Sequence, residues 1–192
     1  MKLLQPWMLP VLLTAGMLLN SGCVLVRKGA ARMISPVATQ LSDGFMREND
    51  VDLVRDGAPA FLLMLDALAE AHPDNPAVLL AAAEAQLAYA VGFVGQEQKE
   101  RAKTMLLKSK TFGLRALSKK NKHFAAAVDG SYDDFRQALT RFKQPDAEAL
   151  LSTATAWVMW IIANSDSPAA LGDMPKVMEL MHIHMSIITA EK

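Results

Sequence analysis

Apolar residues recur at intervals of three and four along most of the chain, which is the spacing of one face of an α-helix. The pattern predicts helices over residues 36–47, 50–71, 76–94, 96–118, 131–142, 145–164 and 175–188. The sequence contains no alternating run rich in Val and Ile and bounded by turn residues. We therefore expect an all-α fold built from antiparallel helical hairpins.

Some predicted boundaries rest on residues that start or interrupt helices. Asn75 can accept hydrogen bonds from the first N–H groups of a helix, and Pro76 suits the first helical position. Ser131 with Asp134 resembles a capping box. Pro59, early in 50–71, predicts a break or kink. Within 96–118 the expected apolar stripe is Ala102, Leu106, Leu107, Leu114 and Leu117.

The predicted helix 76–94 is rich in alanine, and small side chains let a neighbouring helix approach closely. Ala67-Leu68, Pro73 and Ala83 loosely fit the end of a tetratricopeptide (TPR) repeat. The plain helix propensity of alanine is the alternative explanation. We expect a TPR-like solenoid that contains an insertion, because the next Ala-Leu pair, Ala116-Leu117, lies further along the chain than one TPR period.

The N-terminus has the layout of an export signal. Lys2 precedes an uncharged, mostly apolar stretch at 7–19, followed by small and polar residues at 20–22. At about 1.5 Å per residue the stretch reaches only about 20 Å, short of a bilayer core of about 30 Å. We expect residues 1–22 to be a signal peptide, and a membrane-spanning helix is the alternative.

The only cysteine, Cys23, stands at the end of this segment, in a position that resembles the lipobox of bacterial lipoproteins. There the thiol is diacylated and the cysteine becomes the first mature residue, and two acyl chains anchor a protein stably. Asn20 replaces the usual Leu, and a buried or free thiol is the alternative. Val24 after the cysteine resembles lipoproteins sorted to the outer membrane. We expect 23–35 to be the lipidated N-terminus and tether, and 36–192 the TPR-like helical domain.

Composition narrows the classes of function. Hydrophobic residues make up 52% of the chain and charged residues 21%, which is enough apolar surface for a folded core. Lys and Arg together number 20, as do Asp and Glu, so the chain lacks the basic field that supplies nucleic-acid affinity. We expect no nucleic-acid partner.

Candidate catalytic and metal-binding residues are few. His182 and His184 stand two apart on a predicted helix, so their rings point about 200° apart and do not share a metal ion. Asp66 and Glu70 stand four apart and could form an acid–base pair, but solvated carboxylates are the commoner arrangement. We therefore expect no catalytic residue, metal or cofactor, and a protein that is not an enzyme.

Two stripes form the candidate ligand-binding surface. Trp157 and Trp160 share a helical face that ends at Asn164, a lining suited to an apolar ligand with one polar handle. Methionines 174, 178, 181 and 185 share a face of the last predicted helix, and thioethers either fill core gaps or line adaptable pockets. We hypothesise that both stripes face a common groove, and plain core packing is the alternative. The candidate residues are Trp157, Trp160, Asn164, Met178 and Met181.

Several segments, in their shared order, resemble the TRAP transporter T-component family, the TatT-like lipoproteins. They are Gly57 to Leu63, Asp66-Ala67-Leu68, Pro73-Asp74-Asn75-Pro76, the Trp157 to Asp166 stretch, and Pro175, Val177 and Met181. The likeness covers residues 36–192, and the Trp157 to Asp166 stretch is its most specific part.

The resemblance implies a periplasmic, lipid-anchored helical repeat protein that associates with the solute-binding P-component of a tripartite ATP-independent periplasmic (TRAP) transporter. Such proteins are viewed as homotrimers with a hydrophobic pore or cleft, and a role in handling apolar ligands is proposed for them. Family members usually continue beyond the point that corresponds to Lys192, so we expect a shortened array with an exposed apolar face. The alternative function is a membrane-tethered helical scaffold that recognises another envelope protein without binding a small molecule.

Overall fold

The computed structural model describes residues 40, 44 and 47–190. This part of the chain contains helices and no strands, as the spacing of the apolar residues predicts. The signal peptide, the tether, Cys23 and most of the predicted helix 36–47 lie outside the described residues. The long helices are α2 (Val51–Ala71), α3 (Pro76–Phe93), α4 (Lys99–Lys120), α7 (Ala147–Ala163) and α9 (Met174–Thr189). The short elements are η1 (Gln96–Gln98), α5 (Lys122–Ala127), α6 (Tyr132–Leu139), η2 (Gln144–Asp146) and α8 (Pro168–Gly172).

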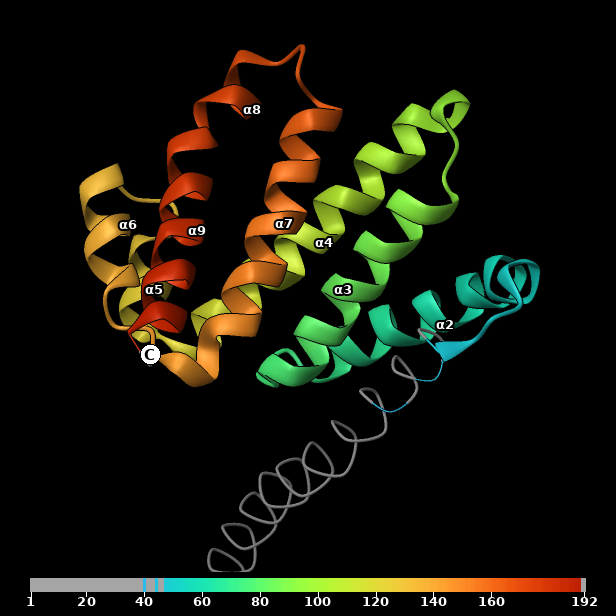
Figure 1. Cartoon of the computed structure of the whole chain (residues 1–192), viewed down its shortest axis with the longest axis horizontal. Coiled ribbons are helices and arrows are strands. Elements are labelled where there is room, and N and C mark those ends of the chain that lie inside the picture. Colours follow the sequence, from blue (N-terminus) through green and yellow to red (C-terminus); the bar gives the residue numbers. More distant parts are fainter. Residues whose placement is uncertain (1–39, 41–43, 45–46, 191–192) are drawn as a thin grey trace, which may run out of the picture.

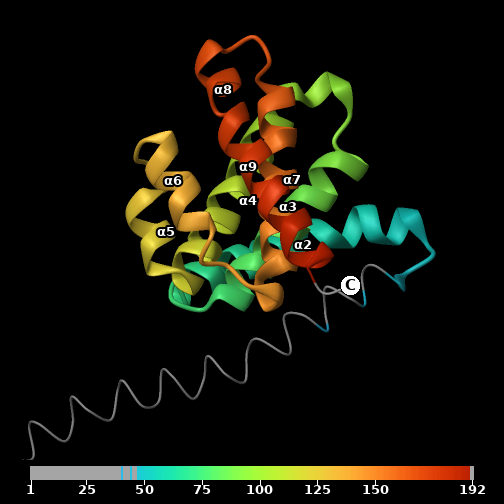
Figure 2. The ribbon, with the colours of Figure 1, turned by 60° about the vertical axis from the view of Figure 1, so that its left-hand side comes forward.

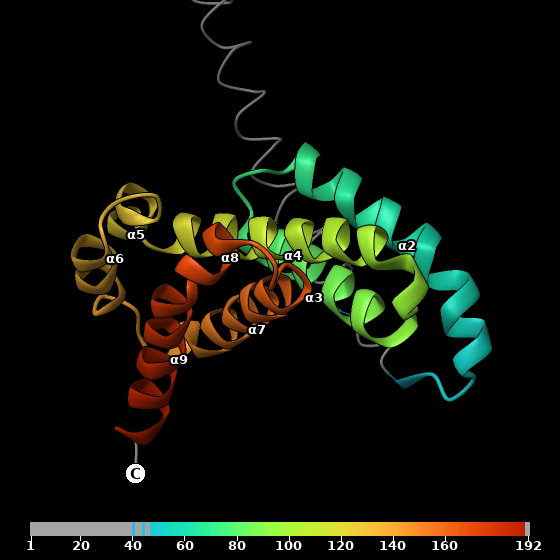
Figure 3. The ribbon, with the colours of Figure 1, turned by 90° about the horizontal axis from the view of Figure 1, so that it is seen from above.

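Helices α3, α4 and α7 form the centre of the molecule. α3 packs against α2 and α4, α4 packs against α7, and α7 packs against α9. Figure 1 shows α2 at one end and the short helices α5 and α6 at the other. Figures 2 and 3 show the same separation from two further directions. In the described part of the molecule, α3, α4 and α7 therefore connect α2 at one end to α5 and α6 at the other.

Polar residues fix the helix starts by accepting backbone hydrogen bonds. Asp50 Oδ1 accepts from Leu53 N at 3.0 Å, and Asn75 Oδ1 accepts from Ala77 N at 3.1 Å. Ser131 Oγ accepts from Asp134 N at 3.2 Å, which is one of the two hydrogen bonds of the predicted capping box, whereas the Asp134 carboxylate accepts from Ser131 Oγ instead of from the Ser131 backbone. The observed bounds of α2, α3 and α9 lie within one residue of the prediction.

Four differences from the sequence-based expectation concern local structure. α2 continues through Pro59 rather than breaking there. α6 ends three residues before the predicted boundary at 142, and the short helices α5 and α8 were not predicted. Leu107, placed on the apolar stripe of α4, is 46% exposed, whereas Ser109 and Phe112 are buried. The buried face of α4 is broader than one stripe because the helix packs against both α3 and α7.

The core divides into three clusters along the molecule. The largest joins α4, α5, α6, α7 and α9 around Phe124, Phe135 and Leu150. A second joins α2, α3 and α4 around Leu65 and Leu79, and a third lies where the same helices meet near Tyr89 and Leu106. Alanines of α3 are buried in the second cluster at positions 81, 82 and 83. Their small side chains let the helices approach closely.

Among the described residues, α3 is the one helix that is long and apolar enough to cross a membrane. Its packing explains this composition, since it contacts α2, α4 and α7 and buries Val78 and Leu79 completely. A helix that is enclosed on several sides needs few polar positions.

Candidate functional site

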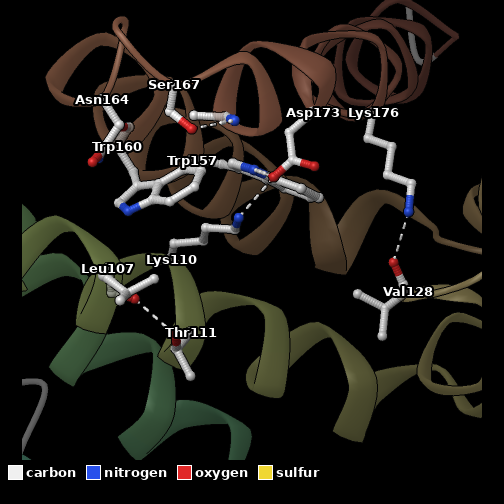
Figure 4. A network of polar contacts seen from close by, with 11 residues as sticks. Leu107, Lys110, Thr111, Val128, Trp157, Trp160, Asn164, Ser167, Asp173 and Lys176 are labelled. Carbon is white, nitrogen blue, oxygen red and sulfur yellow. Dashed lines mark hydrogen bonds and ion pairs between the residues drawn. The ribbon is translucent and has the colours of Figure 1, made fainter.

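The predicted aromatic stripe of α7 faces a lysine of α4. Trp157 is buried and Trp160 is half-buried, and Figure 4 shows the Lys110 side chain reaching between their indole rings. The Lys110 ammonium lies 4.5 Å from the ring centroid of Trp157 and 3.9 Å from that of Trp160. The negative faces of both rings attract the cation at these distances.

Asp173, between α8 and α9, completes this group. Its Oδ2 accepts from Lys110 Nζ at 2.9 Å and from Trp157 Nε1 at 2.9 Å. The lysine side chain is 14% exposed and the aspartate side chain 31%, so the ion pair is largely shielded from water. One carboxylate oxygen thus joins α4, α7 and the start of α9. We name Lys110, Trp157, Trp160 and Asp173 the tryptophan–lysine cluster.

Helix α8 positions Asp173. Ser167 Oγ accepts from Ala170 N at 3.4 Å, and Pro168 occupies the first helical position. The helix ends when Asp173 N donates to the Ala170 carbonyl at 3.2 Å. The short turn reverses the chain after α7, so α9 packs back against α7 with Asp173 beside Trp157.

Asn164, the predicted polar end of the stripe, contacts the backbone of its own helix. Its Nδ2 donates to the Trp160 carbonyl at 2.8 Å, and its backbone N–H donates to the Ile161 carbonyl at 3.0 Å. Asn164 therefore caps the end of α7. The indole N–H of Trp160 makes no hydrogen bond within the described part of the chain, and its nitrogen lies on the side of the ring away from Trp157 (Figure 4).

The structure divides the four methionines of α9. Met174 and Met181 pack against the large core cluster, to which Trp157 belongs and against which Trp160 also packs. Met178 is 65% exposed, and Met185 is also exposed. Met181 and the two tryptophans therefore border the same core, whereas Met178 faces solvent. The common groove for the two stripes stays a prediction.

Sequence reasoning did not single out Lys110 and Asp173. They stand far apart in the chain, and Lys110 is one of many lysines in α4. Local pattern carries no signal for such a pair, because two separate features bring the residues together. α4 packs on α7, and the turn through α8 returns the chain so that Asp173 lies beside Trp157.

The two carboxylates considered as an acid–base pair instead contact basic residues of α4. Lys108 Nζ lies 2.7 Å from Asp66 Oδ2, and Gln86 Nε2 donates to Asp66 Oδ1 at 2.9 Å. Arg115 Nη1 lies 2.7 Å from Glu70 Oε1. These contacts give both carboxylates a role in joining α2 to α4.

The histidines of α9 have separate surroundings. His184 Nδ1 lies 2.9 Å from the Ala147 carbonyl, and His182 Nδ1 lies 3.8 Å from Glu179 Oε1. Within the described residues no group of three or more His, Cys, Asp or Glu side chains could hold a metal ion.

One titratable group at the α6–α9 contact has a shifted pKa. Tyr132 Oη donates to Glu179 Oε2 at 3.2 Å. Partial desolvation of the phenol, followed by the hydrogen bond and negative charge of Glu179, raises the pKa of Tyr132 above its usual value. Tyr132 stays 42% exposed. Replacing Glu179 tests the part of the pKa shift that comes from its hydrogen bond and its charge.

Comparison with known proteins gives one family. A family model described as TRAP transporter T-component matches residues 47–186, which include all of the tryptophan–lysine cluster. A search of the curated proteins finds no match.

Proposed function

Since this chain belongs to the TRAP transporter T-component family, and is thus an accessory component of such a transporter at the cell envelope, we propose that it binds the transporter's solute-binding P-component in the periplasm. The family match over residues 47–186 is the observation that carries the proposal. The protein acts by binding rather than by catalysis, because the functional class of the family is transport.

The N-terminal sequence supports a membrane-anchored form of this function. Cys23 follows a signal-like segment, and one diacylglyceryl group attached to its sulfur gives a palmitate-class anchor that faces the periplasm. Val24 after the cysteine favours the outer membrane. Residues 23–35 then link the anchor to the helical domain, whose α2 is the first long helix that the structure describes.

We further propose that the helical domain has TPR-like packing and assembles as a homotrimer. Neighbouring contacts along the chain, α2 with α3 and α3 with α4, suit a solenoid in which each helix packs on the next.

The ligand proposed for this protein is an apolar molecule held near Trp157, Trp160, Asn164, Met178 and Met181. The half-buried ring of Trp160 and the Met181 thioether at the same core offer apolar contact area. Lys110 stands over the Trp160 ring, so a ligand that reaches this face also meets the lysine side chain.

The alternative is a tethered scaffold that binds a protein partner and no small molecule. Two observations favour it. The Lys110 ammonium lies over both indole rings, and Met178 is exposed to solvent. In the scaffold, the tryptophan–lysine cluster holds the helices in place and the exposed methionine belongs to a contact surface.

The test uses the full-length chain in detergent with the P-component of the same transporter. Titration calorimetry is expected to show saturable binding, and native mass spectrometry is expected to show a trimer with a retained apolar adduct. Absence of P-component binding would refute the accessory role. Binding without any adduct would select the scaffold alternative.

Two variants of α7 sharpen the ligand part of the test. Trp160→Ala is expected to reduce the adduct, whereas Ile162→Ala, which alters an exposed apolar residue of the same helix, is expected to leave it unchanged. Circular dichroism checks that helicity is retained in both. An adduct that survives Trp160→Ala would place the ligand elsewhere.

A further inference from the structure

Most basic side chains in the described part of the chain have a partner. Eight of them form ion pairs with carboxylates: Arg55, Lys103, Lys108, Lys110, Arg115, Lys119, Lys120 and Arg136. Arg101 donates to Gln98, and Lys176 donates to the carbonyls of Val128 and Gly130. Within residues 47–190, side-chain partners are lacking for Arg47, Lys99, Lys122, Arg141 and Lys143.

Three of these five cations gather at one end of the molecule. Lys122 begins α5, and Arg141 and Lys143 stand in the segment between α6 and η2. Lys122, His123 and Arg141 line an open hollow of about 450 Å³. His123 and Arg141 also line an adjoining hollow of about 300 Å³. We name Lys122, His123, Arg141 and Lys143, all of which are exposed, the α5–α6 basic surface.

A buried asparagine fixes the two parts of this surface relative to each other. Asn121 Oδ1 accepts from His123 N at 2.9 Å and from Phe124 N at 3.2 Å, which holds the start of α5. Its Nδ2 donates to the Ala138 carbonyl at 3.1 Å, which holds the end of α6. The rings of Phe124 and Phe142 pack beneath, with centroids 5.5 Å apart. The cations therefore project from a rigid base, which lowers the entropy cost of binding.

Two carboxylates also line these hollows, Asp146 the larger one and Asp134 the smaller one. Asp134 Oδ2 accepts from Ser131 Oγ at 2.7 Å, and within the described residues it forms no ion pair with Lys122, Arg141 or Lys143. Asp146 lies 3.0 Å from Lys120 Nζ, and its Oδ2 accepts from the Lys143 backbone N at 3.1 Å. Both of its oxygens thus have partners, and neither partner is a side chain of the α5–α6 basic surface. The positive charge of Lys122, Arg141 and Lys143 remains available to a binding partner.

We propose that the α5–α6 basic surface docks an acidic face of a partner protein. The cations spread over two elements around open hollows, a shape that receives projecting carboxylate side chains rather than enclosing a small ion. The surface lies at the end of the molecule far from α2, the first long helix that the structure describes (Figures 1 and 3). The proposed anchor at Cys23 precedes α2 in the sequence. This position favours a protein partner over the headgroups of the anchoring membrane.

The identification of that partner as the P-component rests on the proposed function, whereas its acidic chemistry follows from the unpaired cations. Complementary charge across an interface speeds association and selects the partner, and it weakens with added salt. The α5–α6 basic surface would thus set which face of the P-component meets this protein.

The experiment measures fluorescence anisotropy of a labelled octaglutamate peptide, and separately of labelled P-component, with the full-length chain. Lys122→Glu/Arg141→Glu is the test variant, and Arg47→Glu/Lys99→Glu is the matched control. Both doubles change the net charge equally, at exposed cations for which residues 47–190 supply no side-chain partner. We expect octaglutamate affinity to fall about tenfold in the test variant and less than about twofold in the control. Circular dichroism verifies that both retain their helices.

Carbodiimide crosslinking locates the contact, because it joins a lysine amine to a nearby carboxylate as an amide. We expect octaglutamate to be crosslinked to Lys122 and Lys143 and not to Lys99. Equal loss of affinity in the two double variants, or no binding of octaglutamate, would overturn the proposal. Full competition by inorganic phosphate at constant ionic strength would also overturn it, in favour of a small-anion site.

The two probes separate failure of this inference from failure of the proposed function. If the P-component binds equally to the wild type and to the test variant, the accessory role stands and the α5–α6 basic surface is not its docking site. If octaglutamate binding depends on Lys122 and Arg141 but the P-component does not bind, the α5–α6 basic surface still docks an acidic partner, and that partner is not the P-component.

Discussion

The ammonium of Lys110 lies 3.9 Å from the centroid of the Trp160 ring, so a cation of α4 covers the aromatic face that α7 presents. Such contacts stabilise a fold by about 0.5 to 2 kcal/mol, depending on how far the cation is removed from water. Lys110 also pairs with Asp173, and the cluster therefore joins three elements through one charge. Its first role is to hold α4, α7 and α9 together.

Asp173→Ala is expected to lower the free energy of unfolding by about 2 to 3 kcal/mol. The substitution leaves the shielded Lys110 ammonium and the buried Trp157 N–H without their acceptor. Urea denaturation followed by circular dichroism measures the loss. Asp166→Asn, at an exposed aspartate on the neighbouring turn, is the control and should change stability little. Equal stability of the two variants would contradict the role given to Asp173.

Gly113→Ala is expected to destabilise the protein by about 1 to 2 kcal/mol, despite the better helix propensity of alanine. A Cβ at Gly113 would stand 2.8 Å from Thr153 Oγ1, on a threonine that is fully buried between α4 and α7. Thermal unfolding measures the effect. Thr153→Ala added to Gly113→Ala should recover part of the loss, because it removes the closest atom.

Gly92→Ala is the matched control for the glycine substitution. Gly92 also lies within a helix, α3, and nothing stands within 4 Å of a Cβ there. We expect this variant to gain about 0.5 to 1 kcal/mol of stability from helix propensity alone. A similar gain in Gly113→Ala would show that α4 and α7 are less closely packed than the structure has them.

Asn121→Ala is expected to cost about 2 kcal/mol of stability, since it removes the cap of α5 and the bond to the Ala138 carbonyl. Asn121→Ser keeps an oxygen that can accept from the first N–H groups of α5 and lacks the Nδ2 donor, so its loss should be smaller. Chemical denaturation of both variants measures the difference. Equal losses would mean that the cap contributes nothing measurable to stability.

Glu179→Gln is expected to lower the pKa of Tyr132 toward its ordinary value, because the negative charge beside the phenol is removed. In the wild type the folded-state pKa is raised. Tyr132 therefore adds stability below the unfolded-state pKa of about 10, and this contribution is lost as the pH rises through the folded-state pKa. Ultraviolet titration of tyrosinate in a Tyr89→Phe background isolates Tyr132. An unchanged midpoint in Glu179→Gln would contradict the assigned cause.

Helix positions followed closely from the sequence where caps are local. Asn75 with Pro76 and Ser131 with Asp134 act within a few residues of chain, so their effect is encoded where it occurs. The five-residue α8 and six-residue α5 were missed, because helices this short show too little periodicity to separate from turns. Asn121, which caps α5, carries the one local signal that could have revealed it.

The candidate site was predicted in part. Trp157 and Trp160 were identified because both stand on one helical face, and the structure places them at the α4–α7 contact. The surroundings of the methionines were not predictable. Residues that share a helical face can still differ in whether each side chain reaches the core or the solvent. Met181 packs on the core and Met178 does not.

The sequence by itself determined the all-α class and the bounds of the long helices to within three residues, because helical period and capping are local properties of the chain. The order of its short motifs carried the resemblance to a transporter family. The tertiary structure alone decided that Lys110 and Asp173 meet Trp157, and that Lys122 and Arg141 share one surface. The physical reason is distance along the chain. Packing of apolar faces brings charges from remote helices together, and no local pattern records which of them will meet.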